Sequence, residues 1–144
     1  MPQTPVELAI IEKSQALLVW TLKHIEKFPK VHRYGLGLRI EQRLSTILDD
    51  LIEAKFNRDR LPILHRSNLE LERLRFQIRT AKDVKCLSID SYGSASRFVN
   101  EIGQQLGMWI KSIVGGTNEA TRKSVAGTDQ FPQPTDGGSQ RRPR

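Results

Sequence analysis

The chain has 144 residues, a length typical of one domain, and its 38% apolar content can form a core without disulfides or bound metal. The formal net charge is +7, and residues 1–116 carry 18 basic and 13 acidic side chains, or +5 of that total. The single cysteine, Cys86, excludes an internal disulfide and a cysteine-rich metal site. The N-terminus lacks the pattern of a signal peptide, and no stretch approaches the roughly 20 apolar residues of a membrane span, so we expect a cytoplasmic protein without a membrane segment.

Apolar residues recur at helical spacing from residue 6 to residue 114 and predict four helices. The first is expected from about Pro5 to Lys27, with Thr4 as its N-cap. The second is expected from about Tyr34 to Phe56. Gly35 and Gly37 near its start are interpreted as residues that allow close packing, because no strand precedes them and the third glycine of a dinucleotide-binding motif is absent.

The third helix is expected from a cap at Asp59 to about residue 85. The fourth, capped by Asp90 or Ser91, is expected to end near residue 114, where Gly115-Gly116 stops it. Equal helix lengths and short connections predict an all-α fold, an antiparallel up-down-up-down four-helix bundle in residues 1–116. Residues 117–144 have few apolar side chains and are predicted to form a disordered basic tail.

Gly103 and Gly107 are four residues apart in the fourth helix and predict close helix packing, either within the chain or against another subunit. Trp20 and Trp109 are interpreted as core residues, with interface anchors as the alternative. The fourth helix is electrically neutral, which makes it the candidate for subunit packing.

Residues with the potential for catalysis are not arranged for it. His24, His32 and His65 lack the spacing of metal ligands, and no cysteine or carboxylate cluster accompanies them. The carboxylates at positions 49, 50 and 53 are interpreted as a solvated face beside Lys55. We therefore expect a protein without enzymatic activity, metal or cofactor.

The basic side chains indicate a binding function. Arg75, Arg79 and Lys82 follow helical spacing along one face, as do Arg39 and Arg43, and guanidinium groups suit phosphate. Few aromatic residues are expected outside the core, so binding should be directed at the backbone of a nucleic acid, with little base stacking and strong salt dependence. The candidate binding residues are Lys30, His32, Arg33, Arg39, Arg43, Arg58, Arg66, Arg73, Arg75, Arg79, Lys82 and Lys85.

Three segments, 28–44, 58–88 and 92–112, together resemble the accessory variability determinant of diversity-generating retroelements. This family belongs to the bacterial four-helix-bundle proteins that include the ribosomal RNA intervening-sequence proteins, and the resemblance covers about residues 6–114. It implies a basic, pentameric barrel that associates with a reverse transcriptase and binds template RNA and cDNA during mutagenic cDNA synthesis. The family-like basic positions are Lys30, His32, Arg33, Arg39, Arg58, Arg66, Arg79, Lys82 and Lys111.

Two alternatives stay open at the level of sequence. One is a protein of the intervening-sequence type, with ribosomal RNA as its neighbour. The other is a purely structural oligomerisation module whose charge only keeps it soluble.

Overall fold

The computed structural model describes the backbone of residues 5–126 and the side chains of residues 5–116. The chain divides into two compact units, residues 1–110 and 111–144. All secondary structure in the described part is helical. The elements are α1 (Val6–Ile25), α2 (Lys30–His32), the π-helix η1 (Arg33–Gly37), α3 (Leu38–Phe56), α4 (Leu61–Asp83) and α5 (Ile89–Ala126).

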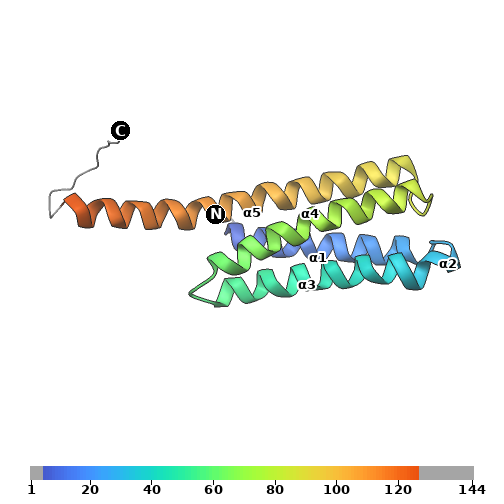
Figure 1. Cartoon of the computed structure of the whole chain (residues 1–144), viewed down its shortest axis with the longest axis horizontal. Helices are drawn as coiled ribbons and strands as arrows, with labels where there is room; N and C mark the ends of the chain where they lie inside the picture. Colours follow the sequence, from blue (N-terminus) through green and yellow to red (C-terminus); the bar gives the residue numbers. More distant parts are fainter. Residues whose placement is uncertain (1–4, 127–144) are drawn as a thin grey trace, which may run out of the picture. The chain divides into compact units, whose positions relative to one another are not determined.

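The first unit is the four-helix bundle predicted from the sequence. Helices α1, α3, α4 and the first part of α5 run alternately up and down (Figure 1). α3 packs against both α1 and α4. Lys13 of α1 and Glu101 of α5 form an ion pair at 2.9 Å, and Gly103 of α5 lies against Leu71 of α4, so each helix has two neighbours.

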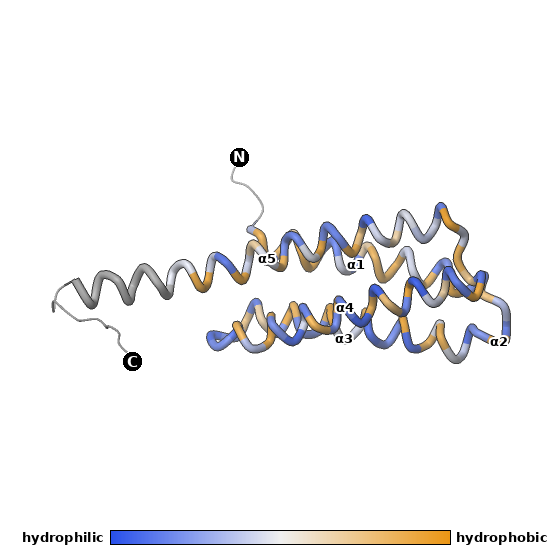
Figure 2. The backbone as a smooth tube through the Cα atoms, turned by 45° about the horizontal axis from the view of Figure 1, so that its top comes forward, coloured by the Kyte–Doolittle hydropathy of each residue, from blue (hydrophilic) through white to orange (hydrophobic). Residues whose placement is uncertain are grey.

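The core consists of the apolar residues that recur at helical spacing, and hydrophobic positions repeat along each helix in Figure 2. Trp109 is buried, which confirms the core interpretation for this residue. Trp20 is half-buried and stacks on His24, with ring centroids 3.7 Å apart. The largest fully buried side chains are Trp109, Ile10, Leu17, Ile40, Leu44, Ile47, Leu51, Leu64, Leu71, Leu74, Ile102 and Leu106.

The predicted helix starts need correction. Pro5 is the N-cap of α1 rather than its first residue, and the predicted cap Thr4 lies outside the described residues. α4 begins after Arg60, not Asp59, because the Asp59 N–H donates to Asn57 Oδ1 at 2.9 Å in a local turn. α5 begins after Ser88, whose Oγ accepts a hydrogen bond from the Ser91 N–H at 3.0 Å. The cap is therefore Ser88, not Asp90 or Ser91.

The predicted second helix starts too late, because the chain is already helical from Lys30. α2 and η1 lead into α3 through a π-helical turn, which the apolar spacing does not encode. A Cβ on Gly37 would lie 2.9 Å from Ile25 Cγ2 and 3.4 Å from the Phe28 ring. The absence of a side chain at this position lets the turn pack on the end of α1, as predicted for Gly37. Gly35 has no atom within 4 Å of such a Cβ.

The predicted stop at Gly115-Gly116 is wrong, because α5 continues to Ala126. Glycine lowers helix propensity by about 1 kcal/mol relative to alanine but still adopts helical dihedrals. The next residues contain good helix formers, and the first proline after them is Pro132. Residues 117–126, predicted to belong to the tail, continue α5 as helix, while the tail from residue 127 lies outside the described residues.

Candidate functional site

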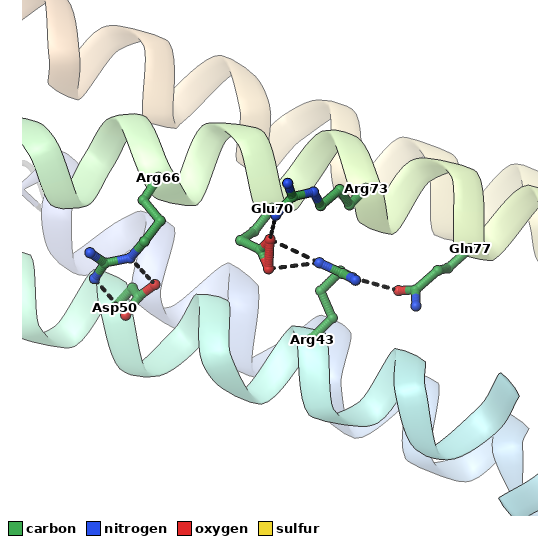
Figure 3. A network of polar contacts seen from close by, with 6 residues as sticks. All are labelled: Arg43, Asp50, Arg66, Glu70, Arg73 and Gln77. Carbon is green, nitrogen blue, oxygen red and sulfur yellow. Dashed lines mark hydrogen bonds and ion pairs between the residues drawn. The ribbon is translucent and has the colours of Figure 1, made fainter. Parts of the chain in front are cut away.

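An arginine-centred network joins α3 to α4 (Figure 3). Arg43 Nη1 donates to both carboxylate oxygens of Glu70, at 2.6 and 2.8 Å, and its Nε donates to Gln77 Oε1 at 2.8 Å. Glu70 also accepts a hydrogen bond from Arg73 Nη1 at 2.7 Å. Arg43 and Glu70 are mostly buried, so this is an interhelical link rather than a solvated cation. The Glu70 carboxylate also balances the charge of Arg43, which lies one helical turn from the like-charged Arg39 on α3.

A second ion pair crosses the same two helices. Arg66 Nη2 and Nε donate to the two oxygens of Asp50, at 3.1 and 3.2 Å. Asp50 is only 8% exposed, so its assignment to a solvated face is wrong, whereas Asp49 and Glu53 are exposed as predicted. The hydrogen bonds and charge of Asp50 raise the pKa of Arg66 above its ordinary value.

The sequence contains a signal for both links that helix-by-helix analysis misses. In an antiparallel helix pair, residues equally distant from the connection lie opposite each other. Asp50 and Arg66 are each eight residues from Arg58, which lies in the α3–α4 connection. Position 43 is opposite position 73 by the same symmetry, and its partners Glu70 and Gln77 lie one turn to either side.

A polar groove runs beside the network between α3 and α4. Its volume is about 430 Å³. Arg39 is the one basic lining residue that makes no side-chain hydrogen bond or ion pair with the part of the chain described. The lining residues are Arg39, Gln42, Arg43, Thr46, Glu70 and Gln77.

The face of α4 toward α5 is also internally paired. Arg75 Nε donates to Glu72 Oε1 at 3.0 Å, and its Nη1 donates to Asn100 of α5. A Cβ on Gly103 would lie 3.1 Å from Arg75 Nη2, so the glycine makes room for this guanidinium. Gly103 therefore serves packing within the chain, whereas a Cβ on Gly107 would have no atom within 4 Å.

Lys82 completes the paired set on α4. Its Nζ lies 3.2 Å from Asp83 Oδ1 and 4.9 Å from the centroid of the Tyr92 ring. In the predicted Arg75–Arg79–Lys82 face, Arg79 is thus the one cation without a side-chain partner among the described residues.

The twelve candidate residues fall into two groups. Arg33 Nη2 donates to the Phe28 carbonyl at 3.3 Å, and it joins Arg43, Arg66, Arg73, Arg75 and Lys82 in the group with partners. The other group makes no side-chain hydrogen bond or ion pair within the described part of the chain. It consists of Lys30, His32, Arg39, Arg58, Arg79 and Lys85.

The unpartnered cations do not gather in one cluster. Arg39 and Arg79 lie on α3 and α4. Lys30 in α2 and Lys85 in the α4–α5 connection lie at one end of the bundle, and Arg58 lies in the connection at the opposite end (Figure 1). These cations are therefore spread over both ends and two helices of the bundle rather than gathered around one small site.

Exposed aromatic rings accompany these cations, contrary to the sequence-based expectation. Tyr34, Phe56 and Phe76 are 70%, 80% and 66% exposed. All three lie outside the buried apolar stripes of their helices, in outward positions.

No group of three His, Cys, Asp or Glu residues in the described part is placed to hold a metal ion. Burial raises the pKa of the Cys86 thiol, which keeps it protonated and weakly nucleophilic at neutral pH. Among the described helices, none combines the length and apolar character needed to cross a membrane.

The fold and surface define an all-α four-helix-bundle protein in which ion pairs cross-link the helices and a second set of cations faces solvent. The family model for bAvd-like proteins matches residues 8–113, and the chain therefore belongs to the bAvd-like family. This confirms the resemblance to accessory variability determinants and makes the chain a bAvd-type accessory protein. No curated protein matches it.

Proposed function

We propose that the protein is a non-enzymatic subunit of a diversity-generating retroelement that binds the reverse transcriptase and nucleic acid, and so supports mutagenic cDNA synthesis. Family membership supports the retroelement context. The observation that carries the nucleic-acid part is the set of solvent-facing cations without carboxylate partners. Arg39 and Arg79 represent this set on the helix faces. Unpaired guanidinium groups are available to replace counterions on phosphates.

The test is fluorescence anisotropy with labelled single-stranded RNA and the full chain. We expect binding at about 50 mM salt that weakens steeply as salt rises. Arg39→Ala and Arg79→Ala should each weaken binding. Each should also reduce the steepness of the plot of log K against log salt by about 1, because one phosphate contact is lost. Neither change should alter the melting temperature, because neither side chain has a protein partner in the described structure.

Arg43→Ala, on the same helix as Arg39, is the matched control that shows the effect of removing a structurally paired arginine. It removes the links to Glu70 and Gln77, and should lower the free energy of unfolding by about 1–3 kcal/mol. Absence of RNA binding at about 50 mM salt would exclude the nucleic-acid function. Binding that Arg39→Ala and Arg79→Ala leave unchanged would show that other residues carry it.

The polymerase part of the proposal needs a separate experiment. A reverse transcriptase encoded beside this gene should co-purify with the protein, in an assembly that contains five copies of the 16.4 kDa chain. A purely structural oligomerisation module would form the oligomer without retaining polymerase or RNA. A protein of the intervening-sequence type would not retain the polymerase.

A further inference from the structure

Phe76 is the most exposed large apolar residue within α4, with 66% of its surface accessible. Leu74 and Ile78, two residues before and after it, are buried in the core, so Phe76 lies on the opposite, outward face of the helix. Leu69, 51% exposed, lies on the same face two turns earlier. An isolated exposed apolar side chain is common on protein surfaces and needs no special role.

The charge around Phe76 distinguishes it from an incidental surface residue. Arg73 and Arg79 are three residues before and after it, so one basic residue lies about one helical turn to either side of Phe76. Arg79 makes no ion pair within the described chain, and Arg73 is 55% exposed while it holds Glu70. The exposed carboxylates of this face are engaged elsewhere, Glu72 by Arg75 and Asp83 by Lys82.

We infer that Phe76 stacks on one unpaired base of a single-stranded nucleic acid, while Arg79, which has no partner in the described structure, contacts the neighbouring phosphate, and the exposed part of the Glu70-bound Arg73 adds positive charge on the other side. Every base offers a π-face, and an aromatic ring in a basic groove or stripe is how single strands are held without sequence preference. The two arginines are separated by about 9 Å along the helix axis, at 1.5 Å per residue.

This inference rests on the proposed function and deepens it, because it selects single strands and assigns a contact to bases. A second copy that docks through this same face fits less well, whereas contact with a different face of a neighbouring subunit is an outcome of the sedimentation test below. A second copy that docked the same face would bring Arg73 and Arg79 against their own counterparts, and such like-charge contacts are unfavourable.

The experiment compares two labelled oligonucleotides of about 12 nucleotides, one with bases and one with abasic sites throughout, by fluorescence anisotropy at low salt. The full chain should bind the oligonucleotide with bases about 5- to 150-fold more tightly, the range expected for one stacked base. Phe76→Ala should abolish this preference without changing affinity for the abasic strand. Phe76→Trp should retain the preference, and the matched control Leu69→Ala should leave it intact.

The outcomes separate the inference from the proposed function. Equal affinity of the wild-type chain for both strands, or an unchanged preference in Phe76→Ala, would exclude stacking while nucleic-acid binding stands. Loss of preference in Leu69→Ala as well would indicate a general apolar contact instead. A change in the mass of the assembly on Phe76→Ala, measured by sedimentation, would make Phe76 a subunit contact. No binding of either strand would remove both claims.

Discussion

Lys85 is held in a backbone conformation that favours glycine. Its φ angle is 67°, and it follows the end of α4 where the Cys86 and Leu87 N–H groups donate to the Ala81 carbonyl at 2.7 and 3.2 Å. This is the left-handed residue that closes many helices, and a side chain there costs about 1–2 kcal/mol. Lys85→Gly should therefore stabilise the fold by about 1 kcal/mol and raise the melting temperature by roughly 4 °C in a calorimetric scan.

The control for this change is Lys85→Ala, which removes the same charge but keeps a Cβ at the strained position. We expect no increase in melting temperature for it. An equal increase in both variants would assign the effect to the lost charge rather than to the backbone. Lys85 is also one of the unpartnered cations, so both variants should bind RNA more weakly than the wild-type chain.

At the scale of elements, the segment that leads from α1 into α3 contains two glycines, and replacing each with alanine is expected to change stability in opposite directions. A Cβ on Gly37 would lie 2.9 Å from Ile25 Cγ2, and a β-branched side chain has little freedom to move away. Gly37→Ala should cost about 1–2 kcal/mol, from overpacking partly offset by helix propensity. Gly35→Ala meets no atom within 4 Å and should gain up to about 1 kcal/mol.

Urea unfolding checks this pair of variants. The midpoint concentration reports the change in stability, provided that the m-value is the same in both variants and the wild-type chain. Equal shifts for Gly35→Ala and Gly37→Ala would mean that propensity alone determines the effect. The close approach of η1 to the end of α1 would then have no energetic weight.

The elements also show where sequence reasoning succeeds and fails. Apolar spacing predicted the four helices, because burial of one stripe per helix is encoded residue by residue. It missed the cap at Ser88 and the end of α5, because these depend on local hydrogen bonds and on propensity beyond the core. Partners such as Asp50 and Arg66 could be found only from the pairing of α3 with α4, since burial of a charge depends on the facing helix.

At the scale of the whole molecule, the net charge of the chain is less informative than the division of its cations. Arg43 and Arg66 use their charges to join α3 to α4, and residues of this kind contribute to stability. Arg39 and Arg79 add to the same net charge but hold no carboxylate in the described structure, and they remain available to a polyanion. Net charge therefore overstates the number of residues that could contact phosphates.

The buried side chains of the described structure lie between Ile10 and Trp109, within the first compact unit. A chain truncated after Gly116 keeps all of them, so its melting temperature should equal that of the full chain within about 2 °C. Helical ellipticity should fall by the contribution of residues 117–126, because α5 extends to Ala126. Circular dichroism measures both quantities on one sample. A marked drop in melting temperature would mean that residues beyond 116 stabilise the bundle, because truncation removes no core residue identified in the first unit.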